Sequence, residues 1–174
     1  RHMPIAASVR TTASASAVAN SVFPGARAPR AAPRLPEAWL APCDGEVTAA
    51  YGVDSHPVTA RARFHEGVDF QAANAVVTAS RSGVVRHAGS NEAYPEYGRF
   101  VVMDHGGHQF SLYANASHLL VEVGDRMSQG DDIAVGGQIA GSGGRRCHFE
   151  ILYGAEGGWR EAQRLDPAPF LGIE

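Results

Sequence analysis

The sequence predicts an all-β domain, built mainly of antiparallel sheets, that follows an irregular or partly helical N-terminal arm. Two observations carry this prediction. From Gly45 onward, short runs rich in β-branched and aromatic residues alternate with Gly, Asn, Asp and Pro, a texture typical of strands joined by tight turns. Before residue 41, Ala, Ser, Arg and Pro dominate, and no sustained hydrophobic period appears.

The arm and the domain differ in composition. Residues 1–40 are predicted to form an arm or linker, and residues 41–174 are predicted to form the domain. The start, Arg1-His2-Met3, resembles a cloning scar rather than a signal peptide. The Ala content of residues 8–22 permits a short helix, although their Ser and Thr content weakens it.

Composition excludes several classes of function. The 174 residues are 44% hydrophobic and 19% charged, as expected for one soluble globular domain. A net charge of −3 without a basic run argues against nucleic-acid binding. All fifteen basic residues are Arg, so the chain lacks the Lys that a lipoyl or biotinyl carrier or a Schiff-base enzyme requires. No apolar run approaches the ~18–20 residues of a membrane span, so we expect membrane attachment only through segments outside this sequence.

Within the domain, β-rich runs predict seven strands in the following order: Val47–Tyr51, Val76–Ser80, Val84–His87, Phe100–Asp104, Gln109–Tyr113, Ile133–Val135 and His148–Leu152. Between the fifth and sixth runs, Gly124 and Gly130 predict a tight β corner, because Gly adopts backbone angles that other residues resist. In the C-terminal tail, closely spaced Pro residues stop any strand, and we expect Phe170 and Leu171 to pack back on the sheet.

The strongest candidate site combines residues from two distant segments. His65, Asp69 and His148 offer two imidazoles and one carboxylate, which is a donor set that suits a zinc ion with a fourth position kept for water. An alternative is that His65 and Asp69 only hydrogen-bond one another and that His148 is an ordinary strand residue. The sequence therefore predicts a Zn²⁺ site with this alternative left open.

Side-chain alternation on the last predicted strand separates two kinds of residue. Arg146, His148 and Glu150 share one face, whereas Cys147 lies on the other face. We therefore expect Cys147 to be a core residue, although its thiolate could ligate zinc in a rearranged site. Cys43 and Cys147 could also form a disulfide in an oxidising compartment, or both could be small core residues.

Further landmarks stand around these residues in a fixed order. They are Tyr51-Gly52, the His65-x-Gly67-x-Asp69 motif, Val77 and Ala79 with Gly83 and Val85, Tyr97-Gly98, Val101 to Gly106, Leu112–Ala114, the Val123-Gly124-Asp125 corner and His148-Phe149-Glu150. With these landmarks, the chain from about Gly45 to Leu171 resembles the LytM/lysostaphin-type zinc metallopeptidases, which cleave peptide cross-bridges in bacterial peptidoglycan. The resemblance implies a mainly antiparallel β fold with a long groove and a duplicated hybrid motif.

The chain departs from this family at two positions. The family's last motif usually reads His-Leu-His-Phe-Glu, and the segment after Leu-Tyr-Ala usually supplies another His, but Arg146 and Asn115 stand here instead. The resemblance implies that those two histidines activate the metal-bound water and stabilise the oxyanion. Neither Asn nor Arg can act as a general base, so we expect little or no peptidase activity. His118, just past the predicted strand end, is a candidate substitute, and His105 and His108 are interpreted as polar loop residues.

The resemblance implies a periplasmic or other cell-envelope location in bacteria, with peptidoglycan or its stem peptides as partners. We expect a catalytically inactive, zinc-binding module that binds peptidoglycan or regulates a cell-wall hydrolase, for instance as an activator of amidases during division. An active zinc metalloendopeptidase that cleaves peptidoglycan cross-links is one alternative, and a scaffold that docks another envelope protein is a second. Arg146 beside zinc also predicts a doubly cationic spot that favours a carboxylate ligand, with Asn115 as a neighbouring donor.

Overall fold

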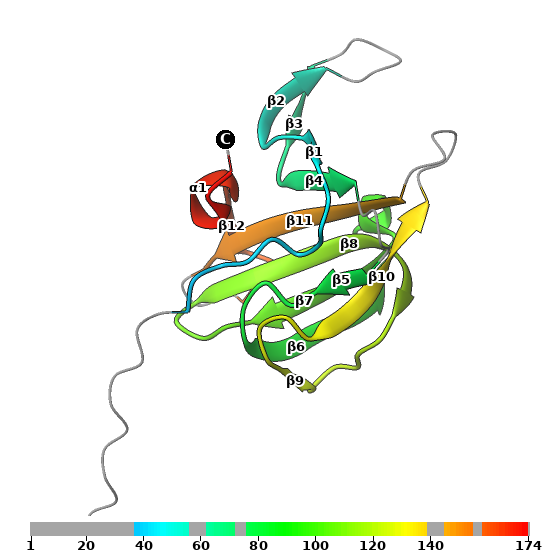
Figure 1. Cartoon of the computed structure of the whole chain (residues 1–174), viewed down its shortest axis with the longest axis vertical. Helices are drawn as coiled ribbons and strands as arrows, with labels where there is room; N and C mark the ends of the chain where they lie inside the picture. Colours follow the sequence, from blue (N-terminus) through cyan, green and yellow to red (C-terminus); the bar gives the residue numbers. More distant parts are fainter. Residues whose placement is uncertain (1–36, 56–61, 72–75, 139–144, 155–157, 174) are drawn as a thin grey trace, which may run out of the picture. The chain divides into compact units, whose positions relative to one another are not determined.

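A computed structural model describes residues 37–55, 62–71, 76–138, 145–154 and 158–173 (Figure 1). Residues 1–36 lie outside this part of the chain, so the limits predicted for the arm and the domain stay a prediction. The residues that follow are attached to the domain. Trp39 is buried in its core, and the backbone N–H of Leu40 donates to the carbonyl of Ser80 at 3.0 Å.

One ten-stranded sheet forms most of the described structure, and each strand pair in it is antiparallel (Figure 1). Its strands lie in the order β1 (Val47–Ala49), β4 (Val68–Gln71), β11 (Arg145–Tyr153), β10 (Asp132–Gln138), β8 (Gln109–Leu119), β7 (Arg99–Asp104), β6 (Gly83–Ser90) and β9 (Arg126–Met127), while β12 (Gln163–Leu165) pairs with β11 and β5 (Val76–Thr78) pairs with β10. A separate hairpin joins β2 (Gly52–Ser55) to β3 (Ala62–His65). The prediction of a mainly antiparallel all-β fold is confirmed, and each of the seven predicted runs overlaps a strand.

The central strands β7, β8 and β11 are buried on both faces. One face carries alternate residues such as Val101, Tyr113 and Phe149, which pack into the larger core cluster. The other face carries Phe100 and Leu112, which pack into a second, aromatic-rich cluster. Because side chains alternate along a strand, a strand that is covered on both faces has a nearly continuous hydrophobic run in the sequence.

The structure contains the predicted β corner, and the C-terminal tail stops forming strands as predicted. Gly124 and Gly130 have positive φ angles of 101° and 88°, on either side of the short strand β9. The tail forms a one-turn helix, α1 (Ala168–Leu171), instead of continuing as a strand, and Leu171 packs against the larger core. Phe170 remains 39% exposed, with its ring 6.3 Å from that of Trp39. In the described part of the chain, no helix has the length and hydropathy needed to cross a membrane.

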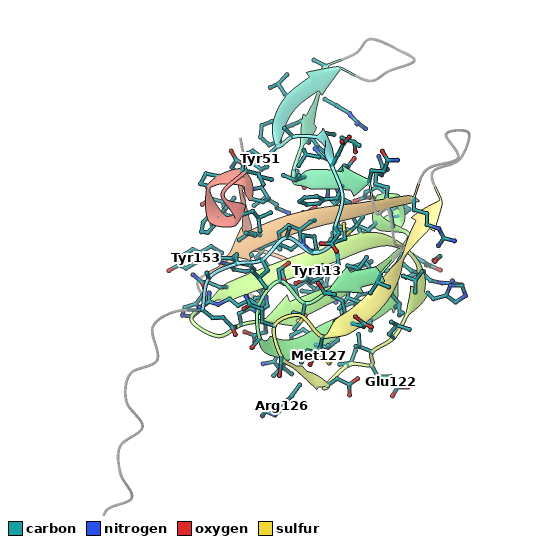
Figure 2. The ribbon with its side chains drawn as sticks, viewed as in Figure 1. Tyr51, Tyr113, Glu122, Arg126, Met127 and Tyr153 are labelled. Carbon is teal, nitrogen blue, oxygen red and sulfur yellow. The ribbon has the colours of Figure 1, made fainter. Side chains whose placement is uncertain are left out.

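A short chain of hydrogen bonds ties strand β8 to the loop between β5 and β6. Tyr113, labelled in Figure 2, is fully buried, and its hydroxyl accepts from the backbone N–H of Ser80 at 2.8 Å. Ser111 Oγ lies 2.9 Å from this hydroxyl and 2.7 Å from His105 Nε2. The ring of His105 also bonds the carbonyl of Ser82 at 2.9 Å, and burial lowers its pKa. His105 is thus a structural tie within the fold, whereas His108 is an exposed turn residue with a φ of 64°.

Both cysteines are free thiols buried in the larger core, and burial raises the pKa of each. Cys147 faces this core, on the opposite side of β11 from His148. This placement agrees with the core-residue interpretation and leaves no ligand role for Cys147 among the described residues.

Candidate metal centre

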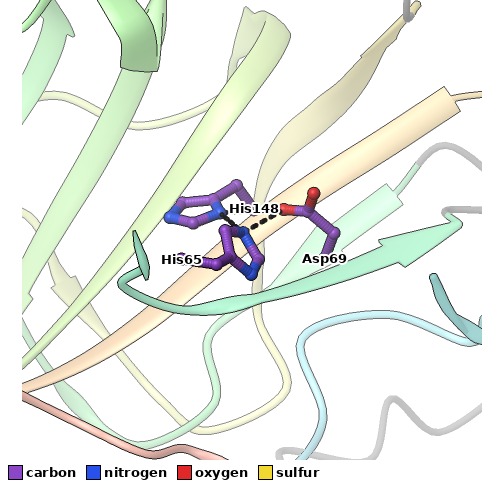
Figure 3. Close-up of side chains that lie close together, drawn as sticks. All are labelled: His65, Asp69 and His148. Carbon is purple, nitrogen blue, oxygen red and sulfur yellow. Dashed lines mark hydrogen bonds and ion pairs between the residues drawn. The ribbon is translucent and has the colours of Figure 1, made fainter. Parts of the chain in front are cut away.

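Three elements bring the predicted ligands together (Figure 3). His65 is the last residue of β3, and a tight turn leads into β4, which carries Asp69. His148 lies on β11 directly opposite Asp69, because β4 and β11 pair in antiparallel register. Residues about eighty positions apart in the sequence therefore meet across one strand pair.

Gly67 makes this meeting possible. A Cβ built on Gly67 would collide with the carbonyl oxygen of Phe149 and would lie 2.9 Å from a ring carbon of His148. Contacts that short do not occur for real Cβ atoms, so only Gly allows the turn between His65 and Asp69 to lie flat against β11. The Gly of the His-x-Gly-x-Asp motif is explained by close backbone approach.

The distances among the three ligand atoms fit a zinc ion. His148 Nδ1 lies 2.8 Å from Asp69 Oδ1, His65 Nε2 lies 3.2 Å from His148 Nδ1, and His65 Nε2 lies 3.3 Å from Asp69 Oδ1. Ligands held 2.0–2.2 Å from a tetrahedral zinc are separated by roughly 3.3–3.6 Å, so the three atoms lie close to this spacing and a little nearer to one another. All three residues are buried, and no other such group of metal-binding side chains occurs in the described ranges.

The outer nitrogens of the two imidazoles strengthen this assignment. His65 Nδ1 lies 2.8 Å from the carbonyl oxygen of Ala50, and His148 Nε2 lies 3.0 Å from Glu150 Oε1. Both partners are acceptors, so each imidazole uses its outer N–H as a donor and turns its other nitrogen inward. Two inward lone pairs beside a carboxylate require a cation between them. This arrangement suits a metal ion, and it includes His148 as well as the His65–Asp69 pair.

A proton can supply that positive charge when no metal is present. Burial lowers the pKa of His148, but hydrogen bonds to Asp69 and Glu150 outweigh burial and raise this pKa to about 9. Burial likewise raises the pKa of Asp69, but hydrogen bonds from both histidines and the charge of Arg146 hold it well below its usual value. The site is therefore built to keep Asp69 ionised and to hold a cation against it.

Arg146 is bound to the site more tightly than the sequence suggested. Its Nη1 donates to Asp69 Oδ2 at 2.9 Å. The other carboxylate oxygen, Oδ1, faces the two histidines. The Arg146 side chain is 30% exposed, and its buried Nε finds no partner among the described residues. The expected doubly cationic spot consequently depends on the metal, because Asp69 alone neutralises Arg146.

A pocket of about 220 Å³ opens over the ligands. Its described lining residues are Arg63, Phe64, His65, Glu66, Asp69, Glu96, Tyr97, Asn115, Arg146, His148 and Glu150. Asn115 and Arg146 thus face the site, as their sequence positions indicated.

His118 is exposed and lines a different shallow pocket with Ser117, Val135 and Arg145. The expectation that His118 lies past the strand end is wrong, because β8 continues to Leu119.

Asn115 occupies a bulge in β8, between the segment paired with β11 and the segment paired with β10. Its φ of 62° lies in the left-handed region, which Asn and His visit more readily than most residues. Gly137 of β10 has no side chain to collide with the carbonyl of Asn115, so the backbones approach closely here. The bulge is what turns residue 115 toward the pocket.

Sequence reasoning missed a second group of residues behind the ligands. Glu150 is completely buried, and its carboxylate accepts from the hydroxyl of Tyr97 at 2.6 Å and from Nε of Arg164 at 3.3 Å. Burial, followed by the nearby Glu150 charge, raises the pKa of Tyr97. Alternation on β11 already placed Glu150 on the same face as His148, and Tyr97 was one of the ordered landmarks. Nothing in the sequence pointed to Arg164.

A family model described as Peptidase family M23 matches residues 63–167, which is more than half of the chain. The peptidoglycan DD-endopeptidase ShyA of Vibrio cholerae is 33% identical over 98 residues, covering 56% of this chain and 22% of that protein. The murein hydrolase activator EnvC of Escherichia coli is 37% identical over 76 residues, covering 44% of this chain and 16% of that protein. The chain thus spans about a fifth of the length of these curated relatives.

Solved structures show the same fold. The catalytic domain of the antimicrobial peptidase lysostaphin from Staphylococcus simulans superimposes with a TM-score of 0.59 at 26% identity, covering 74% of this chain and 92% of that domain. A zinc-containing peptidase from Vibrio cholerae superimposes with a TM-score of 0.58 at 24% identity, covering 75% of this chain and 39% of that one. The expected LytM/lysostaphin-like fold is confirmed.

Proposed function

The chain belongs to peptidase family M23, and from this premise we propose that its domain is a zinc-binding module of the bacterial cell envelope that does not hydrolyse peptides. His65, Asp69 and His148 hold the ion. The module binds peptidoglycan stem peptides or regulates a cell-wall hydrolase such as an amidase. The similarity to a relative named as a murein hydrolase activator supports a regulatory role. The proposal includes a periplasmic or other envelope location, which the names of these relatives support because they refer to peptidoglycan and murein.

The composition of the pocket carries this proposal. Among the described residues that line it, the only histidines are the two proposed ligands. Asn115 and Arg146 occupy the positions from which acid and base catalysts would act, and neither can accept a proton near neutral pH. Because a positioned acid or base contributes roughly 10²–10⁴-fold in rate, losing two leaves little catalysis.

The remaining chemistry favours capture of a carboxylate. Bound zinc supplies Lewis acidity and a coordination position for an oxygen ligand. Zinc and Arg146 carry three positive charges against one negative charge on Asp69, so the space next to the ion favours an anion, although Glu66, Glu96 and Glu150 also line the pocket. Arg146 also keeps donors that can form charge-assisted hydrogen bonds, and Asn115 adds an amide donor. Acidic groups of stem peptides, or an acidic segment of a partner protein, match this chemistry.

One observation favours a second candidate, an active endopeptidase. Glu66 and Glu96 also line the pocket, and a carboxylate can serve as a general base beside a metal. The relative named as a DD-endopeptidase belongs to this alternative. Glu66 is, however, engaged by Arg164, whose Nε lies 3.4 Å from its carboxylate.

The deciding experiment measures zinc content and digestion of purified peptidoglycan for the parent and for Asn115→His/Arg146→His. We expect both to bind zinc and only the double variant to digest, because residue 115 tolerates His at its positive φ and both lost catalysts are restored. His118→Ala in the double-variant background is the control, and it should leave digestion unchanged. Digestion by the parent would overturn the proposal, and its loss in Glu96→Gln would then support the endopeptidase.

A further inference from the structure

We propose that Glu150 is the positioning residue of the metal site: it holds the ring of His148 so that Nδ1 faces the ion, and Tyr97 and Arg164 in turn hold Glu150. This inference rests on the zinc site of the proposed function. It deepens that function by assigning a role to the three residues behind the ligands.

Both carboxylate oxygens of Glu150 accept hydrogen bonds from neighbouring side chains. Its Oε1 accepts from His148 Nε2 at 3.0 Å and from the Tyr97 hydroxyl at 2.6 Å, while its Oε2 accepts from Arg164 Nε at 3.3 Å. Glu150 is 0% exposed. Burying a carboxylate is costly unless it is paired and hydrogen-bonded, so this residue needs all three partners.

The hydrogen bond to His148 selects one form of the ring. A carboxylate only accepts, so the proton of neutral His148 must reside on Nε2, and Nδ1 is left with a lone pair directed at Asp69 and His65. The ring of Tyr97 is nearly parallel to that of His148, with 25° between the planes and 5.9 Å between the centroids. Glu150 fixes the proton, and Tyr97 limits rotation of the ring.

Arg164 extends this support to the other ligand-bearing segment. It lies on β12 opposite Leu152 of β11, which places it beside Glu150. Its Nε also approaches the carboxylate of Glu66, the residue that follows the ligand His65. A single guanidinium therefore links the turn that carries His65 to the strand that carries His148.

The test is the zinc dissociation constant of the folded domain, measured by competition with a chromophoric chelator, for the parent, Glu150→Gln and Tyr97→Phe. Loss of a hydrogen-bonding partner behind a ligand typically weakens metal binding 10–100-fold, and we expect a loss of this size in Glu150→Gln and a smaller one in Tyr97→Phe. The exposed Glu161→Gln is the matched control and should bind zinc like the parent.

Thermal melting of the zinc-free proteins separates positioning from simple stabilisation. If Glu150→Gln lowers the melting temperature but leaves the zinc dissociation constant within twofold of the parent's, the proposal is overturned. If the variant does not fold, nitrogen NMR of the zinc-loaded parent decides, since a proton on Nε2 of His148 supports the proposal and one on Nδ1 overturns it. A parent that binds no zinc removes both the metal site and the role of Glu150, whereas peptidoglycan digestion by the parent would overturn only the proposed lack of hydrolysis.

Discussion

At the scale of single residues, Arg146 changes the chemistry of the site most. In place of a titratable base, it puts a permanent cation on the outer oxygen of Asp69, 2.9 Å away. That contact keeps Asp69 ionised and restrains its geometry as a ligand. It also makes the affinity of the pocket for anions depend on the metal, because the negative charge of Asp69 neutralises the positive charge of Arg146 when zinc is removed.

Arg146→Gln should therefore weaken binding of a carboxylate without weakening binding of a neutral ligand. We expect a loss of about 10–150-fold for a tripeptide with a free C-terminal carboxylate and no loss for its amide, measured by calorimetry on the zinc-loaded domain, because one charge-assisted hydrogen bond contributes roughly 1.5–3 kcal/mol. Arg145→Gln is the control, since Arg145 bonds the carbonyl of Gly136 and does not line the pocket.

Two results would contradict this prediction. Arg146→Gln could keep the parent's preference for the free acid, or the zinc-free parent could show the same preference as the loaded protein. Either result would mean that the positive charge of zinc and Arg146 does not select the ligand.

The residue types of the site were readable from the sequence, because donor chemistry belongs to individual side chains. His65, Asp69 and His148 were identified in this way, and so were the unusual Asn115 and Arg146. The ion pair between Arg146 and Asp69 was not readable, since β4 and β11 are brought together only by folding. For the same reason, the sequence placed His118 near the site, while its side chain lies in another pocket.

At the scale of elements, the turn between β3 and β4 depends on its contact with β11. Gly67 allows this contact, and a methyl group there would press on the backbone of Phe149 and on the ring of His148. The turn would have to move away from β11, and His65 and Asp69 would move with it.

Gly67→Ala should consequently lose zinc while the sheet still folds. We expect at least a tenfold weaker zinc affinity, and a loss of stability of roughly 1–3 kcal/mol from overpacking, measured by chelator competition and urea unfolding. Val68→Ala is the control, because it removes packing from the larger core but leaves the turn in place. If both variants lost stability and both retained zinc, the steric explanation for Gly67 would be wrong.

The predicted runs overlap the strands that are buried on both faces and also the less buried strands β1, β5 and β6, but they miss the hairpin and the helix. The runs in β7, β8 and β11 stood out as apolar. The hairpin of β2 and β3 did not, because Val53 and Phe64 are 80% and 56% exposed and show no buried face. Helix α1 is only one turn long and contains Pro169, so it gave no helical signal.

At the scale of the whole domain, zinc would join strand β3 of the separate hairpin to strands β4 and β11 of the ten-stranded sheet. Its three ligands lie on β3, β4 and β11, so an ion bound by all of them favours the folded chain over the unfolded one. Free zinc at a hundred times its dissociation constant contributes roughly 2.7 kcal/mol to stability.

Removing zinc with a chelator should therefore lower the melting temperature by about 5–15 °C, followed by circular dichroism. His148→Ala should melt at the same temperature with and without added zinc, because it lacks one ligand. Identical melting of the loaded and the chelator-treated parent would show that the ion does not hold these strands together.

The sequence by itself determined the β-class of the domain and its family, and it identified the proposed metal ligands and the two altered positions. These depend on local periodicity, on turn residues and on the chemistry of single side chains. Only the tertiary structure decided which charges neutralise one another and which residues support the ligands. Arg164 reaches Glu150 because β12 pairs with β11, and Arg146 reaches Asp69 because β4 does. Such pairings are set by the register of distant strands, which no short stretch of sequence specifies.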